Sequence, residues 1–255
     1  MRFDIITLFP ELFAPMLTTG ITRRAFEPSQ VDVRLWNLRD FAQGNYKRVD
    51  DRPFGGGPGM VMLAEPLAQC VEHINKDRAA TAPVVLFSPI GQKLDHAQVQ
   101  TWSTSEGAIL ICGRYEGLDQ RFIDRYVTNQ ISLGDFVLSG GEIAAMALLD
   151  AVARLQPGVL GDEGSHQQDS FNPALDGLLD CPHYTRPENW QGQIAPQVLL
   201  GGHHEQIELW RRQQRLSLTR QLRPEFLEAA RAAGRLSVED EKFLTLVPSP
   251  LVGEG

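Results

Sequence analysis

Hydrophobic positions along the first 155 residues follow two alternating patterns. Short apolar runs predict five strands, over 2–8, 31–36, 83–88, 108–113 and 129–134. Apolar residues at helical spacing, or a proline that can open a first turn, predict helices over 10–17, 65–74, 95–102, 118–127 and 140–155. Strands that alternate with helices predict an α/β fold, with a parallel sheet that helices cover on both faces.

Three predicted strands end in residues that suit a ligand pocket. Residues 87–89, 112–114 and 133–135 each contain Gly, Pro or Ser directly after an apolar run. In open parallel sheets, ligands bind beyond the carboxyl ends of the strands. We therefore expect these three loops to form one pocket at one edge of the sheet.

The pattern changes after residue 155. Residues 156–173 are rich in Gly, Gln and acidic side chains with little periodicity, whereas 177–246 contain three helical stretches. A loop of this length is commonly functional or disordered. We predict four parts: an α/β domain over 1–160, a flexible interdomain loop over 161–175, a helical domain over 176–246 and a disordered tail over 247–255.

Composition and charge narrow the class of protein. The formal net charge of −8 excludes a globally basic nucleic-acid binder but leaves room for a local basic patch. The three cysteines lie far apart without a CxxC pair, which predicts reduced thiols in the cytosol. No apolar run approaches the roughly 18 residues of a membrane span, and the first residues do not resemble a secretory signal. We predict a soluble cytoplasmic protein.

The turn at Gly140-Gly141 joins an apolar run to a helical stretch. Glu142 follows where a Walker loop needs Lys and Ser or Thr, and no GxGxxG fingerprint occurs. An acid at the mouth of a pocket would repel a phosphate, so a ligand with a neutral or positive reacting centre fits better. A plain glycine turn is the alternative. No HExxH, paired CxxC or GxSxG motif supports a metal site or a serine nucleophile.

Two basic stretches and one aromatic loop add further candidate chemistry. Residues 46–60 place basic side chains among glycines, and residues 211–223 hold five arginines and no acid, so both suit a nucleic-acid backbone. A flexible surface loop and a solvated helix face are the alternatives. In the loop 112–119, Tyr115 and Glu116 follow a strand, where an aromatic ring can cover a purine or pack on the core.

These stretches together resemble one known family. The motifs LFPELF, VDDRPFGGGPGM, CGRYEGLD, SLGDFVLSGGE, DAVARLQPGVLG and LLDCPHYTRP occur in the order typical of bacterial tRNA (guanine-N1-)-methyltransferases, which modify guanine 37 beside the anticodon. The resemblance runs from about residue 1 to about residue 245. It implies a SPOUT fold with a C-terminal trefoil knot, S-adenosylmethionine as methyl donor, and tRNA as substrate. It also implies a homodimer with the active site between subunits, and no membrane or DNA partner.

The resemblance assigns the cofactor to the three strand ends and the glycine turn. The implied cofactor residues are Leu86, Phe87, Pro89, Gly113, Tyr115, Glu116, Leu133, Gly134, Asp135, Phe136, Val137, Leu138, Gly140 and Gly141. Where many relatives carry a proline after Gly-Gly-Glu-Leu, this chain has Ala144 after Ile143. Alanine is a good helix former, so we expect little harm to binding.

The resemblance also implies catalytic roles. Asp169 would remove the N1 proton of guanine, and Arg154 would stabilise the charge that builds on guanine O6. The residues alone leave Asp162, Glu163 and Asp169 open as the base, and each is equally an ordinary loop acid. Arg154 is equally a cation favoured at a helix C-terminus.

The implied tRNA contacts lie in the two basic stretches and are Arg52, Gly55, Gly59, Arg220 and Arg223. The family depends on magnesium, for which Glu116 is the candidate ligand, although the sequence contains no dedicated metal site. Two rival functions remain: a Rossmann-like nucleotide-dependent enzyme and a non-catalytic RNA-binding module.

Overall fold

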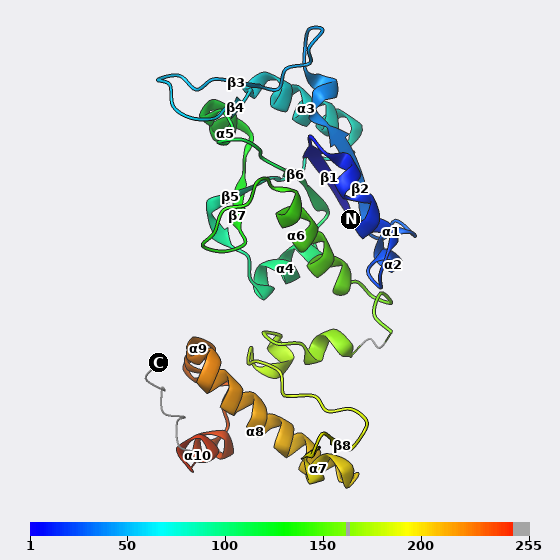
Figure 1. The fold of residues 1–255 in the computed structure, drawn as a ribbon, viewed down its shortest axis with the longest axis vertical. Coiled ribbons are helices and arrows are strands. Elements are labelled where there is room, and N and C mark those ends of the chain that lie inside the picture. The colour runs from blue at the N-terminus through cyan, green and yellow to red at the C-terminus, as the bar shows by residue number, and fades with distance from the viewer. Residues whose placement is uncertain (162–163, 247–255) are drawn as a thin grey trace. The chain divides into compact units, whose positions relative to one another are not determined.

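The computed structural model describes residues 1–161 and 164–246. By its internal contacts the chain divides into two compact units, Met1–Glu163 and Gly164–Gly255 (Figure 1). The division falls within the stretch predicted as an interdomain loop. The predicted tail at 247–255 lies outside the described residues. No helix among the residues that the structure describes is long and apolar enough to cross a membrane.

A five-stranded sheet organises the first unit. Its strand order is β2-β1-β6-β5-β7, and every neighbouring pair is parallel. The strands are β1 (Arg2–Thr7), β2 (Asp32–Asn37), β5 (Val84–Lys93), β6 (Gly107–Ile111) and β7 (Asn129–Ser132). The α/β fold with a parallel sheet, predicted from the alternating pattern, is confirmed. All five strands therefore end at the same edge.

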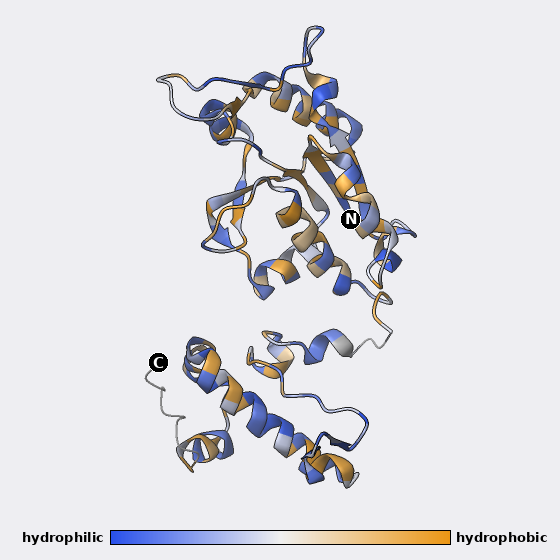
Figure 2. Cartoon of the chain, viewed as in Figure 1, coloured by the Kyte–Doolittle hydropathy of each residue, from blue (hydrophilic) through white to orange (hydrophobic). Residues whose placement is uncertain are grey.

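Helices cover both faces of the sheet because the side chains of each strand alternate between them. Phe3 and Ile5 of β1 share one core with α4 and α6, whereas Ile6 shares the other with α3 and α5 (Figure 1). These helices are α3 (Ala64–Asp77), α4 (His96–Ser103), α5 (Gln120–Tyr126) and α6 (Glu142–Arg154). The hydrophobic colour of the central strands in Figure 2 follows from this double burial.

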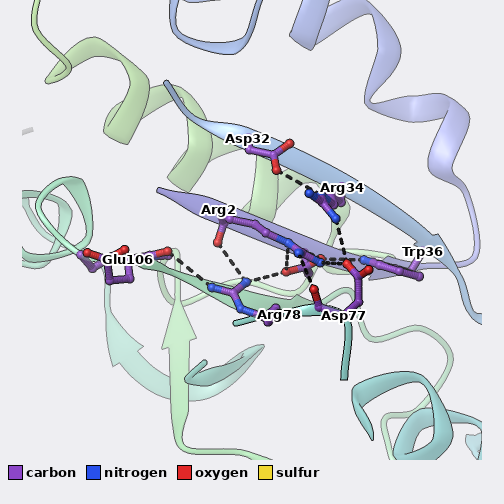
Figure 3. A network of polar contacts seen from close by, with 10 residues as sticks. Arg2, Asp32, Arg34, Trp36, Asp77, Arg78 and Glu106 are labelled. Atoms are coloured by element: carbon purple, nitrogen blue, oxygen red, sulfur yellow. Dashed lines mark hydrogen bonds and ion pairs between the residues drawn. The ribbon is translucent and has the colours of Figure 1, made fainter. Parts of the chain in front are cut away.

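A network of charged side chains lies where β1 begins (Figure 3). Asp4 is fully buried and accepts hydrogen bonds from Arg2, from Arg78 and from Trp36 Nε1, the last at 2.8 Å. Asp77, at the end of α3, accepts a second bond from Arg2 at 2.7 Å. The buried carboxylate is thus compensated by charge and by hydrogen bonds, as a buried ion requires. The network joins the start of β1 to the end of α3.

The remaining elements of the first unit are short: η1 (Pro10–Leu12), α1 (Ala14–Thr18), α2 (Arg23–Phe26), η2 (Leu38–Phe41), β3 (Asp50–Asp51) and β4 (Val61–Met62). The prediction of one helix over 10–17 is wrong, since a 3-10 turn and a short helix divide it. Pro15 lacks a backbone N–H and therefore suits the first turn of a new helix rather than the interior of a continuing one.

The second unit is mainly helical, as its periodicity predicts. Its elements are η3 (Ser165–Gln168), η4 (Pro173–Leu175), the hairpin of β8 (Asn189–Trp190) and β9 (Gln193–Ile194), α7 (Gln197–Leu200), α8 (His204–Leu222), α9 (Pro224–Ala232) and α10 (Val238–Leu246). Leu178, Leu216, Leu227 and Leu244 form its core. The stretch predicted as a flexible interdomain loop over 161–175 contains two 3-10 helices.

Candidate active site

A cavity of about 400 Å³ opens at the carboxyl edge of the sheet. Its lining comes from the ends of β5, β6 and β7 and from the segment before α6, so the three predicted loops do meet in one pocket. Twelve of the fourteen predicted cofactor residues line this cavity. Gly134 and Asp135 are not among the lining residues.

A bulge in β5 shapes one wall of the cavity. The pairing of β5 with β7 shifts register between Phe87 and Gln92, so the intervening residues leave the ladder. Gly91 lets the strand rejoin, because a Cβ there would lie 2.5 Å from the backbone nitrogen of Ile131. Pro89 has no N–H to donate and suits the unpaired position. The strand therefore runs to Lys93, beyond its predicted end.

The loop after β6 forms the opposite wall. Tyr115 has φ of 60° and leaves 47% of its surface exposed. This left-handed conformation is costly for a non-glycine residue and commonly marks functional sites. The backbone N–H of Glu116 donates to Met60 O at 2.9 Å, and that of Met62 donates to Gly117 O at 2.8 Å. The end of the glycine-rich loop 46–60 is thereby attached to the cavity wall.

The two glycines that begin α6 are required by the fold itself. A Cβ on Gly140 would lie 2.2 Å from Arg114 Nε, and a Cβ on Gly141 would lie 2.8 Å from Cys112 Cα. The Gly141 N–H also donates to Gly113 O at 3.0 Å. The bare backbone thus makes room for the Arg114 side chain and for the loop after β6, which the sequence pattern did not indicate.

Glu142 does not lie at the mouth of the pocket, and that interpretation of the sequence is wrong. Its side chain is buried, with 1% exposed, because the first turn of α6 faces the end of β1. The Thr7 hydroxyl donates to Glu142 Oε1 at 2.8 Å, and Arg114 Nη2 lies 2.9 Å from Oε2. Burial raises the pKa of the neighbouring Cys112 thiol well above its usual value, and the Glu142 charge adds to that shift.

Arg114 lies in one of the three loops predicted to form the pocket, but the sequence analysis gave it no functional role. It lines the cavity and also a second hollow of about 350 Å³, beside Phe9, Tyr115 and Ser139. The available signal was its position between Gly113 and Tyr115, directly after a strand whose end was already assigned to the pocket.

Comparison with known proteins identifies the family. The family model of tRNA (Guanine-1)-methyltransferase TrmD matches residues 1–229. The chain belongs to this family. It is 77% identical to the tRNA (guanine-N(1)-)-methyltransferase of Albidiferax ferrireducens over 244 residues, which cover 96% of this chain and 98% of the relative. The same named enzymes of a Polaromonas species and of Paracidovorax citrulli are 70% and 68% identical over 248 residues. These cover 96% of this chain and 96% and 97% of the two relatives.

The two residues implied as catalytic in this tRNA (guanine-1)-methyltransferase family belong to different units. Arg154 is the last residue of α6 in the first unit, and Asp169 directly follows η3 in the second. Both are partly buried. Asp162 and Glu163, the other acids considered for the base, lie outside the described residues. The structure does not test either role.

The arginines of α8 are occupied within the second unit. Arg211 pairs with Glu208, Arg212 with Asp176 and Asp240, Arg215 with Asp180, and Arg223 with Glu225; Arg220 donates to Leu244 O. Most of these acids come from other segments of the chain, so the acid-free run 211–223 does not form an uncompensated basic face. The predicted tRNA contacts at Arg220 and Arg223 stay predictions.

The glycine-rich loop presents a different surface. Arg52 is exposed, and Gly55 and Gly59 have positive φ, at 84° and 76°. Phe54 is 98% exposed in the same loop.

The described ranges 1–161 and 164–246 contain no group of three or more His, Cys, Asp or Glu side chains that could hold a metal ion.

Proposed function

We propose that this chain methylates N1 of guanine 37 in tRNA with S-adenosylmethionine as donor, and that it acts in the cytoplasm as a homodimer whose active site lies between subunits. The observation that carries the proposal is the family match over residues 1–229, together with the single cavity that gathers twelve of the fourteen implied cofactor residues. The trefoil knot, the dimer and a magnesium dependence through Glu116 are further parts of the proposal.

The cavity suits an adenosyl sulfonium better than a nucleotide phosphate. Its wall carries apolar side chains from Leu86 to Leu138, the exposed ring of Tyr115 and the carboxylate of Glu116, and its one cation among the described residues, Arg114, is paired with Glu142. Its volume is within the range typical of small-molecule sites. Bound there, S-adenosylmethionine would supply a methyl group already activated by its positive sulfur.

The protein must then remove a proton and hold the purine. Guanine N1 becomes nucleophilic only when its proton leaves, and we assign that proton to the carboxylate of Asp169. We assign to Arg154 the stabilisation of negative charge on O6.

The exposed glycine-rich loop is our candidate surface for the tRNA backbone. Arg52 provides charge, and Gly55 and Gly59 are exposed residues without side chains, where a phosphate backbone could approach the main chain. The loop ends on the wall of the cavity through the bonds of Met60 and Met62, so a contact there is continuous with the reaction site. The proposed contacts of Arg220 and Arg223 would require these side chains to exchange their present partners.

Methyl transfer from labelled S-adenosylmethionine to a tRNA transcript tests the proposal, with guanine 37 replaced as the substrate control. We expect Asp169→Asn to retain cofactor affinity and to lower single-round turnover by about 10²–10⁴-fold, the usual contribution of a general base. Asp150→Asn is the matched control, because Asp150 is exposed on α6.

Three outcomes contradict parts of this proposal. Undiminished turnover of Asp169→Asn would remove that residue as the base. Equal labelling of the transcript without guanine 37 would remove the assigned position. Binding of tRNA without any methyl transfer would favour the RNA-binding module instead.

A further inference from the structure

The wall of the cavity contains a cation that a positively charged ligand must face. Among the lining residues, all within the described ranges, Arg114 and Glu116 are the charged ones. An uncompensated guanidinium in a partly enclosed wall raises the free energy of a bound cation, because low-dielectric surroundings screen the repulsion poorly. A site for a sulfonium therefore needs the charge of Arg114 to be neutralised.

Glu142 lies behind Arg114 and supplies the opposite charge. Arg114 Nε donates to Glu142 Oε1 at 3.2 Å, and Nη2 lies 2.9 Å from Oε2. Oε2 makes no hydrogen bond in the described part of the chain, so that second contact is electrostatic rather than a well-aligned bond. Glu142 is buried and does not line the cavity, whereas the Arg114 side chain is 20% exposed. The carboxylate acts on the cavity through the arginine.

Arg114 is held in place by more than Glu142. Its guanidinium lies over the Phe9 ring, 4.6 Å from the centroid, and Nη1 donates to Ser139 O at 3.2 Å. Gly140 provides the space that its Nε occupies. A change of Glu142 to glutamine keeps one acceptor oxygen for Thr7 and Arg114 Nε, but it turns the oxygen that faces Arg114 Nη2 into an NH2 group. Arg114 keeps its contacts with Phe9 and Ser139 O, so we expect it to stay in the cavity wall.

We propose that Glu142 is a positioning residue that sets the selectivity of the cavity between the donor and its product. By neutralising Arg114, it raises affinity for the cationic sulfonium of S-adenosylmethionine relative to the neutral thioether of S-adenosylhomocysteine. This inference rests on the proposed function, because it takes the cavity to be the donor site. It is distinct from a general structural role, since a loosened pocket would lose both ligands to a similar extent.

The test is a titration of both ligands into the full-length protein, with the ratio of the two dissociation constants as the readout. We expect Glu142→Gln to weaken S-adenosylmethionine relative to S-adenosylhomocysteine by roughly ten-fold, the order expected of one unit charge acting across about 10 Å at an effective dielectric constant near 20. Arg114→Gln should shift the ratio in the opposite direction. The double variant R114Q/E142Q restores neutrality and should return the ratio to within about two-fold of the wild type.

Asp4→Asn is the matched control, because it removes another buried, arginine-paired carboxylate that does not line the cavity. It should leave the ratio unchanged. If Glu142→Gln does not fold, Arg114→Gln alone carries the test. A ratio that stays the same, or moves the same way in both single variants, overturns the inference while the proposed function stands. A wild-type protein that binds neither ligand overturns the proposed donor site and the inference with it.

Discussion

Two buried carboxylates, Asp4 within strand β1 and Glu142 beside its last residue, differ in what surrounds them. In the first half of the strand, Asp4 accepts hydrogen bonds from Arg2, Arg78 and the indole of Trp36. At its end, the hydroxyl of Thr7 meets Glu142 from α6, and a single arginine completes the contact. Asp4 is thus enclosed by its hydrogen-bond partners, whereas Arg114, the arginine that pairs with Glu142, also lines the cavity.

This difference follows from the direction of the strands. In a parallel sheet the starts of the strands meet the ends of the helices, so Arg78, directly after α3, reaches Asp4, and Asp77 at the end of α3 accepts from Arg2. The ends of the strands meet loops and helix starts, where ligands bind. At one edge of the sheet the acid–arginine pair of Asp4 and Arg78 stabilises the fold. At the other edge the pair of Glu142 and Arg114 adjoins a cavity in which a ligand can bind.

Asp4→Ala should produce the largest loss of stability. Removing one partner leaves Arg78, which is itself nearly buried, without its carboxylate, and such a change costs about 3–5 kcal/mol. Urea denaturation measures the loss, and the exposed Asp150→Ala is the control, which should change stability by about 0.5 kcal/mol or less. A loss as small as that of the control would contradict the assigned role of the Asp4 network.

Gly140→Ala tests the other edge with a smaller expected effect. The added methyl group collides with Arg114 and must displace it from Glu142, at an overpacking cost of about 1–3 kcal/mol. Affinity for S-adenosylmethionine should fall at the same time. Gly161→Ala, which meets nothing within 4 Å, is the control for both measurements. Unaltered affinity and stability together would show that Arg114 yields freely and does not clamp the loop.

The second unit contains another acid–arginine pair, Asp240 with Arg212, whose acid is less deeply buried than Asp4. Burial acts to raise the pKa of Asp240, but the hydrogen bonds and charge of Arg212, together with the bond from the Ser237 N–H, outweigh it and hold the pKa below its usual value. Because the folded pKa is depressed, this carboxylate stabilises the fold above its unfolded pKa of about 3.9, and the contribution is lost as pH falls through the folded value. The carboxyl carbon of Asp240, followed by NMR, should titrate below that of an unfolded peptide, and Arg212→Gln should raise its midpoint. An unchanged midpoint in the variant would assign the shift to another group.

Hydrophobic periodicity predicted much of this fold because the residues that form one strand or one helix are neighbours in the sequence. The alternation of apolar runs predicted the parallel sheet, and residues 87–89, 112–114 and 133–135 each contribute to one cavity as predicted, although β5 continues to Lys93. The quoted motifs indicated the family, and the family match confirms that prediction. The domain boundaries, the knot and the catalytic roles of Asp169 and Arg154 stay predictions.

The tertiary structure decided which charges are paired, and that changed the picture of the site. The sequence alone places Glu142 beside a glycine turn and shows five arginines without an acid in residues 211–223, whereas the fold joins Glu142 to Thr7 across 135 positions and Arg212 to Asp240 across 28. Such contacts depend on how helices pack on strands and on other helices, which no local pattern records. Chain order was therefore sufficient for the sheet, its carboxyl edge and the family, while only packing in three dimensions revealed Arg114 and its buried partner.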